Sequence, residues 1–252
     1  MTRLLINTRP AERALALTQA AQQAGLAVFE LPLLHLEPEP WNEHLDQLYQ
    51  QLLEANVIVV VSPMAVECGM RYLQQAGITL TQLQHIEWVA VGQKTAECLA
   101  TYHIKSAIPE VETSEGMLKL PLLEDLPAQS KIAFWRGEGG RQFMMQQLHQ
   151  QGMQILNFVL YRRALPLMSR QEIPRLRQLL GHYQYFTVLI SSEASWKYWL
   201  SLWQDDPHVI SSAHYLVLGE RVSQLMQQQF KQALQLNVLA DLSPQRILEH
   251  IA

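Results

Sequence analysis

Short apolar runs alternate with longer amphipathic stretches along almost the whole chain. The clearest run is 57–61, in which five β-branched residues follow one another. An unbroken run of this kind is typical of a strand that is covered on both faces, as in a parallel sheet. Further strands are predicted at the runs 4–6, 28–36, 88–91, 107–108, 132–135, 158–163, 186–190, 215–218 and 237–239, the second of which is interrupted by Pro32.

Helical spacing fills the intervals between these runs. The stretch 11–24 is followed by Gly25, which is suited to end a helix. Its apolar positions are Ala14, Leu15, Leu17 and Ala21. Ser62-Pro63 and Ser243-Pro244 each combine a capping serine with a proline suited to the first helical position. Strands that alternate with helices predict an α/β fold with mainly parallel sheets.

The two halves of the chain repeat the same pattern. Arg9 lies sixteen residues before Gly25, and Arg136 lies sixteen residues before Gly152. The later turns match in the pairs Ser62 with Ser192, Gly92 with Gly219, and Ser114 with Ser243. The pattern predicts a duplication of two successive units, A and B. Unit A covers about 1–38 and again 131–165, and unit B covers about 39–120 and again 167–252. The alternative is that any α/β chain repeats strand, turn and helix at about this pitch.

These matched turns are the candidate ligand surface, because ligands bind beyond the carboxyl ends of strands in open α/β sheets. We expect the surface in a cleft between the two halves. Its members are Arg9, Ser62, Gly92, Ser114, Arg136, Ser192, Gly219 and Ser243. Each serine by itself is explained by ordinary capping of a helix N-terminus. Together, hydroxyls and free N–H groups at helix starts suit a ligand with many negative groups.

Composition narrows the class of protein. A chain of 252 residues makes one large or two small domains. The net charge of -4 and the pI of about 6.1 argue against a nucleic-acid partner. The two cysteines lie among apolar neighbours and indicate a reducing compartment. No apolar run is long enough for a signal peptide or a membrane span, so we expect a cytoplasmic protein without a membrane partner.

Catalytic motifs are mostly absent from the sequence. The nine histidines lack metal-ligand spacing, and neither Cys-x-x-Cys nor Gly-x-Ser-x-Gly occurs. The glycine-rich loop 136–141 lacks the features of a nucleotide site and is better suited to carboxylates. Thr95 can add a hydroxyl to the ring of donors, or it is a tolerated helix threonine. Tyr161 lies at the junction between the two halves of the chain. It is either a candidate site residue or a packed aromatic on a connecting strand.

An ordered set of motifs covers nearly the whole chain. They are LINTRP at 5–10, VVSPMAV at 60–66, AVGQKTA at 90–96, TSEG at 113–116, RGEGGR at 136–141 and YRR at 161–163. In this order they resemble the uroporphyrinogen-III synthase family. Each motif alone is degenerate, whereas the ordered set is specific.

The resemblance implies two α/β domains joined by a two-stranded connector that the chain crosses twice. The first domain would combine 1–34 with 168–252, the second would span 39–160, and the connectors would be 33–38 and 158–167. The implied reaction is that of a lyase: hydroxymethylbilane loses water and closes, with inversion of ring D, to give uroporphyrinogen III. The resemblance implies neither a cofactor nor a metal.

The resemblance also implies roles for individual residues. Tyr161 would assist departure of the hydroxyl as a hydrogen-bond donor, and Thr95 would contact the substrate. Substrate binding would involve Arg9, Ser62, Gly92, Ser114, Arg136, Gly137, Ser192 and Gly219. The chain departs from the family pattern at Val222, where some members have threonine, and at Glu193, where others have proline. A monomer is expected, with transient contact to hydroxymethylbilane synthase left open.

Two rival functions remain open at this point. Two α/β lobes also describe a cytoplasmic ligand-binding or sensor module without catalysis. The loop 136–141 allows a nucleotide-dependent transferase, which thermal stabilisation by nucleotides would favour.

Overall fold

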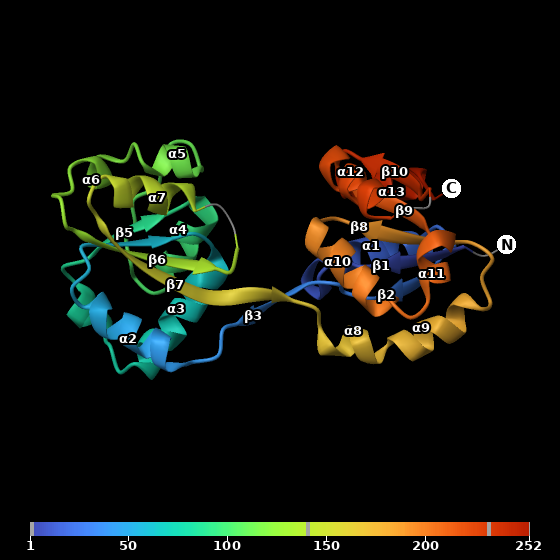
Figure 1. Cartoon of the computed structure of the whole chain (residues 1–252), viewed down its shortest axis with the longest axis horizontal. Coiled ribbons are helices and arrows are strands. Elements are labelled where there is room, and N and C mark those ends of the chain that lie inside the picture. The colour runs from blue at the N-terminus through green and yellow to red at the C-terminus, as the bar shows by residue number, and fades with distance from the viewer. Residues whose placement is uncertain (1–2, 140–141, 231–232, 252) are drawn as a thin grey trace. The chain divides into compact units, whose positions relative to one another are not determined.

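The chain forms two compact units. The computed structural model describes residues 3–139, 142–230 and 233–251. Unit 1 consists of the residues up to His35 together with those from Arg163 onward, and unit 2 is Leu36–Arg162. Each unit is built on a five-stranded sheet (Figure 1).

The sheet of unit 1 has the strand order β10-β9-β8-β1-β2. Its strands are β1 (Leu4–Asn7), β2 (Ala27–Glu30), β8 (Phe186–Ile190), β9 (His214–Leu218) and β10 (Gln235–Leu239), and all their pairings are parallel. Strand β1 lies between β2 and β8, and all four of its residues are buried. The apolar run at the start of the chain is therefore a central strand.

Helices cover both faces of this sheet. Leu4 and Ile6 pack in one cluster with Trp199, whereas Leu5 packs in another with Leu17. This split follows from the strand geometry, because successive side chains point to opposite faces. One face carries α9 (Ile173–Leu180), α10 (Glu193–Leu202), α11 (Pro207–Ser212) and α12 (Glu220–Gln229), and the other carries α1 (Ala11–Gln23) and α13 (Pro244–Glu249). Helix α8 (Leu167–Gln171) precedes α9.

The sheet of unit 2 has the order β3-β7-β6-β4-β5. Its strands are β3 (His35–Pro38), β4 (Val57–Val60), β5 (Glu87–Ala90), β6 (Lys131–Gly137) and β7 (Gln154–Ala164), with parallel pairings from β5 through to β7. Its helices are α2 (Glu43–Leu52), α3 (Pro63–Gln75), α4 (Gln93–Ala100), α5 (Ser114–Met117), α6 (Pro121–Glu124) and α7 (Phe143–Gln150), with a 3₁₀ turn, η1 (Leu80–Leu83). Ile58 and Val60 face the cluster of α2, α3 and α4, whereas Val57 and Val59 face that of α5, α6 and α7.

The two sheets share one spatial order. Strands β2, β1, β8 and β9 of unit 1 correspond to β7, β6, β4 and β5 of unit 2. Beyond β9 comes β10, and beyond β5 comes a single parallel bridge from Val89 to Ala107. These are the pairs that the repeated sequence pattern matches. The correspondence supports the duplication, which stays a prediction.

The α/β fold with mainly parallel sheets is confirmed, and three finer expectations are wrong. The run 28–36 is not one strand but contributes to β2 and β3, which belong to different sheets. Pro32, which has no N–H group to donate, lies between them. The run 107–108 makes only a bridge, because its pairing is confined to one residue. Leu15 is 63% exposed and does not belong to the buried face of α1.

The helices of both units are short. Within the described part of the chain, none of them is long and apolar enough to cross a membrane.

Candidate active site

The predicted site residues lie at the carboxyl ends of parallel strands. In unit 2, Ser62 follows β4 by two residues and Gly92 follows β5 by two, while Gly137 ends β6. Because β4 pairs parallel with β5 and β6, these three positions share one edge of the sheet. In unit 1, Ser192 and Gly219 follow β8 and β9 at the corresponding edge.

Two of the serines, Ser62 and Ser192, cap their helices through the side chain, as expected. The Ser62 hydroxyl accepts a hydrogen bond from the backbone N–H of Ala65 at 3.1 Å. The Ser192 hydroxyl accepts one from Ser195 N–H, also at 3.1 Å. Each bond satisfies a donor that has no partner within the first turn of its helix. Each hydroxyl has a second partner: Ser192 Oγ donates to Ser195 Oγ within the same helix turn at 3.1 Å, whereas Ser62 Oγ lies 2.9 Å from the hydroxyl oxygen of Tyr161, which is remote in sequence.

An irregularity in strand pairing places Tyr161. The register between β6 and β7 shifts at Arg136/Gly137, so that Gly137 lies opposite Tyr161. A Cβ at position 137 would lie 2.4 Å from Cε2 of the Tyr161 ring, which only glycine avoids. Strand β7 thus lays the tyrosine across the end of β6, with its hydroxyl at the start of α3. The structure brings together three of the predicted site residues: Ser62, Gly137 and Tyr161.

The two predicted arginines hold strand-end loops. Arg136 is 6% exposed and donates to the carbonyl oxygen of Gly139. Burial lowers the pKa of Arg136, against a smaller raising effect of Tyr161. Arg9 donates through Nη1 to the carbonyl oxygen of Leu242 at 3.2 Å. Of the predicted anion loop, Gly140 and Arg141 lie outside the described residues.

The turn at Gly92 already holds a carboxylate. Glu112 Oε1 accepts a hydrogen bond from the backbone N–H of Gln93 at 2.7 Å, at the start of α4. A Cβ at position 92 would lie 2.4 Å from the Glu112 carboxyl carbon, so any larger residue there would displace this carboxylate. The helix start therefore binds an anion, as expected of its free donors. Glu112 was not predicted, because nothing in the local pattern of an exposed loop indicates where its carboxylate goes.

The remaining predicted residues differ in burial, helix capping and backbone conformation. Thr95 lies in the first turn of α4 and is 2% exposed, so it is buried rather than presented at the surface of the described structure. Ser114 is the first helical residue of α5, and the cap is Thr113, whose hydroxyl accepts from Gly116 N–H at 3.0 Å. Gly219 has φ +76, a backbone conformation that favours glycine. Ser243 is the N-cap of α13, but its side chain accepts no hydrogen bond from the described residues of that helix.

Metal-ligating side chains do not gather into a candidate site in the described part of the chain. Within 3–139, 142–230 and 233–251, no group of three or more of them is placed to hold a metal ion.

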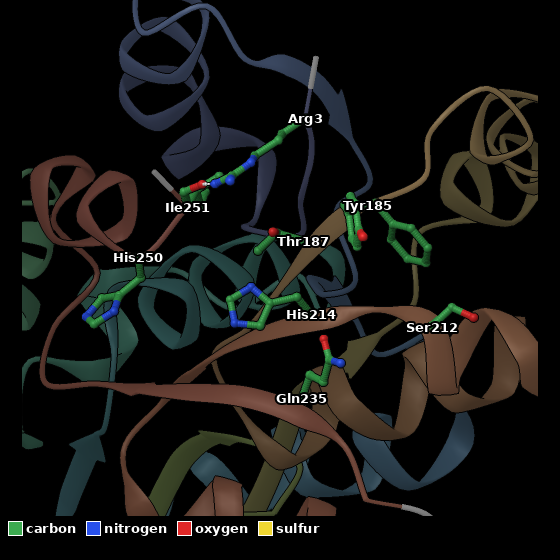
Figure 2. Close-up of a pocket in the computed structure, with 9 residues that line it drawn as sticks. Arg3, Tyr185, Thr187, Ser212, His214, Gln235, His250 and Ile251 are labelled. Atoms are coloured by element: carbon green, nitrogen blue, oxygen red, sulfur yellow. Dashed lines mark hydrogen bonds between the residues drawn. The ribbon is translucent and has the colours of Figure 1, made fainter. Parts of the chain in front are cut away.

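A cavity of about 320 Å³ opens at the other edge of the unit 1 sheet (Figure 2). Its lining includes Arg3, which precedes β1, and the first residues of β9 and β10, His214 and Gln235. Arg3 donates to the Ile251 carbonyl (Figure 2). His214 Nε2 lies 2.6 Å from Asn237 Oδ1. Because these are the amino ends of the strands, the cavity is distinct from the predicted ligand surface.

Comparisons with known proteins agree with the fold. A solved uroporphyrinogen-III synthetase from Helicobacter pylori has a TM-score of 0.59 and 16% identity, covering 99% of this chain and 97% of that chain. A mutant uroporphyrinogen III synthase from Thermus thermophilus has a TM-score of 0.57 and 16% identity, covering 100% and 98%. The wild-type enzyme of that organism, in another crystal form, has a TM-score of 0.50 and 17% identity, covering 100% of both chains. At these identities the similarity shows the fold alone.

The family itself follows from a match along the sequence. The family model described as Uroporphyrinogen-III synthase HemD matches residues 16–235, which is most of the chain. The matched range includes the turns at Ser62, Gly92, Arg136 and Ser192 and the tyrosine at 161. The chain therefore belongs to the uroporphyrinogen-III synthase family and is an enzyme of tetrapyrrole synthesis.

Proposed function

We propose that this chain converts hydroxymethylbilane to uroporphyrinogen III and is a lyase, closing the linear tetrapyrrole with loss of water and inversion of ring D. The observation that carries the proposal is the placement of Tyr161 across Gly137 with its hydroxyl 2.9 Å from Ser62 Oγ. A phenol at a strand end can donate a hydrogen bond to a leaving hydroxyl group. This fits a reaction that begins with the loss of water.

Tyr161 acts at the first step of the proposed reaction. The carbon–oxygen bond of the hydroxymethyl group breaks, and its electron pair remains on the departing oxygen. The Tyr161 proton moves to that oxygen, so that water leaves and the substrate carbon becomes azafulvene-like. Ring D then inverts: its substituted α-carbon bonds to the azafulvene carbon, which gives a spiro intermediate, and the bond from that α-carbon to the methylene bridge of ring C breaks. The free α-carbon of ring D bonds to this methylene and loses its proton, which returns to Tyr161. Atoms and charge balance over the cycle with water as the only by-product.

The strand-end donors bind the eight carboxylates of the proposed substrate. Glu112 on the N–H of Gln93 supports this assignment, because it shows that the start of α4 accepts a carboxylate. Thr95, Arg9 and Arg136 contribute at their turns, the arginines by holding the loops at Leu242 and Gly139 as well as by their charge. Positioning that keeps the wrong ring carbon out of reach accounts for inversion as an orientational effect. The substrate-binding set also includes Ser62, Gly92, Ser114, Gly137, Ser192 and Gly219.

The organisation of the protein is part of the proposal. The two units are the two domains of a duplicated chain, with connectors near 33–38 and 158–167. The protein acts as a monomer in the cytoplasm, and transient contact with hydroxymethylbilane synthase is left open. Support for a reducing compartment comes from Cys68 and Cys98, which are both free thiols.

Product analysis tests the function directly. Purified protein is incubated with fresh hydroxymethylbilane, and the oxidised uroporphyrin isomers are separated by chromatography. We expect mainly isomer III, where a control without enzyme gives isomer I. Isomer I alone would overturn the proposal and favour the non-catalytic binding module.

Replacing Tyr161 by phenylalanine tests the donor. We expect Tyr161→Phe to lower kcat by about 10-fold or more, because a positioned proton donor is lost. Tyr185→Phe is the matched control, since Tyr185 is 61% exposed and lies at the amino end of β8. Turnover of Tyr161→Phe equal to that of the control would remove Tyr161 from the mechanism.

A further inference from the structure

We infer that Ser62 is a positioning residue for Tyr161, which orders the tyrosine hydroxyl so that its proton points to the substrate. The inference rests on the proposed function and changes the role of Ser62 within it. The sequence predicts Ser62 as a direct ligand of substrate carboxylates. The structure instead assigns its hydroxyl to two partners within the protein, Ala65 N–H and the Tyr161 hydroxyl.

The hydrogen-bond capacity of serine allows Ser62 to donate to Tyr161. A serine hydroxyl has one proton to donate and two lone pairs to accept with. Ala65 N–H, in the first turn of α3, donates to Ser62 Oγ at 3.1 Å and occupies one lone pair. The Ser62 proton is available to the Tyr161 oxygen, 2.9 Å away, and we infer that Ser62 is the donor of this pair. When Ser62 donates in this way, the Tyr161 proton is free for the leaving hydroxyl.

Two further features favour this direction. Successive hydrogen bonds in a chain polarise one another, so donation from Ala65 N–H strengthens Ser62 as a donor. The positive end of the α3 dipole acts in the same sense, because it attracts the serine lone pairs and turns the proton outward. The ring of Tyr161 is held against Gly137. The backbone carbonyl oxygen of Tyr161 accepts a hydrogen bond from Glu138 N–H at 2.6 Å. Backbone and ring are thus fixed, and the hydroxyl direction is what remains for Ser62 to set.

Three substitutions of Ser62 separate capping from proton direction. Ser62→Thr keeps both a cap acceptor and a donor, and we expect it to retain most of the turnover. Ser62→Asp keeps the cap but accepts the tyrosine proton instead of donating, so kcat falls although the protein stays folded. Ser62→Ala loses both functions, and we expect kcat to fall on the order of 5-fold with KM little changed. Asn42→Ala is the control for capping, since Asn42 caps α2 in the same unit by accepting from Leu45 N–H at 2.9 Å.

A double-mutant cycle tests whether Ser62 acts through Tyr161. We expect Ser62→Ala to cause no further loss of kcat when it is added to Tyr161→Phe, because the proton that it directs is already absent. A loss that multiplies with that of Tyr161→Phe, or a rise in KM for Ser62→Ala alone, would overturn the inference and restore direct substrate binding by Ser62. Full turnover of Ser62→Asp would also overturn it. A wild-type protein that forms only isomer I would instead refute the proposed function.

Discussion

At the scale of single residues, Gly92 and Gly219 occupy matched turns for different physical reasons. Gly219 has a positive φ of +76, so the backbone itself requires glycine. Gly92 has an extended backbone with φ -170, and the reason for glycine is the carboxylate of Glu112 beside it. The sequence predicts a small residue at both turns. Only the structure distinguishes the two causes.

The contact of Glu112 predicts a measurable effect on stability. We expect Glu112→Ala to lower the free energy of unfolding by about 1 kcal/mol, because the N–H of Gln93 and the positive end of α4 lose their anion. Urea unfolding of the variant measures this. Glu110→Ala is the matched control, because Glu110 is exposed in the same loop. Equal unfolding midpoints for the two variants would show that the contact does not contribute.

Two buried tyrosines predict how stability responds to alkaline pH. Tyr49 donates to the Gly69 carbonyl and Tyr215 to the Ile210 carbonyl, and burial raises the pKa of both above the ordinary value of 10.0. Above about pH 10 the unfolded chain loses these protons while the folded protein keeps them. The contribution of these tyrosines to the free energy of unfolding is therefore fully present below pH 10. It falls as the pH rises, by up to about 1.4 kcal/mol per pH unit for each tyrosine.

Urea unfolding between pH 8 and pH 11 tests this dependence. We expect Tyr215→Phe, compared with wild type, to reduce the slope above pH 10. The exposed Tyr185→Phe should leave the slope unchanged. The same slope in Tyr215→Phe as in wild type would contradict the burial argument.

At the scale of elements, the approach of α3 to its sheet depends on a glycine in the helix. Glycine in a helix interior costs about 1 kcal/mol relative to alanine. Gly69 is tolerated because a Cβ there would lie 2.1 Å from Cε3 of Trp135, a fully buried ring on β6. The helical periodicity of 63–75 does not indicate this contact, because Trp135 is remote in sequence.

Substitution of Gly69 tests whether close packing against Trp135 or helix propensity has the larger effect on stability. We expect Gly69→Ala to lower the free energy of unfolding by about 1–3 kcal/mol, because overpacking outweighs the gain in helix propensity. Thermal unfolding measures the change. Gly181→Ala is the control, since the nearest atom to its Cβ is the Gln178 carbonyl oxygen at an acceptable 3.4 Å. A melting temperature of Gly69→Ala at or above wild type would contradict the packing argument.

At the scale of the whole molecule, each unit buries its own cores. The clusters on the two faces of the unit 2 sheet contain only residues of Leu36–Arg162. The clusters of unit 1 combine residues before His35 with residues after Arg163, because β1 is inserted between β8 and β2. Unit 2 is thus continuous in sequence, whereas unit 1 is not.

This difference predicts the behaviour of fragments. We expect the fragment 36–162 to fold alone and to unfold cooperatively, because it contains both cores and all of the sheet except the first residue of β3 and the last two of β7. The fragment 163–252 should not fold alone, since β8 would lose its neighbour β1 and a row of hydrogen-bonding partners. Circular dichroism with thermal unfolding measures both. A non-cooperative 36–162, or a cooperative 163–252, would show that the cores depend on chain outside these ranges.

The local pattern of residues by itself determined the class of fold, the order of most strands and helices, and the turns at which function is expected. These features depend on neighbours in sequence, because the alternation of side chains and the capping of helices are local. The tertiary structure alone decided that 28–36 contributes to two sheets, that Glu112 lies at Gly92, and that Ser62 meets Tyr161. The last contact depends on a one-residue shift between β6 and β7. Strand register is a property of two remote segments together, so no pattern within either segment contains it.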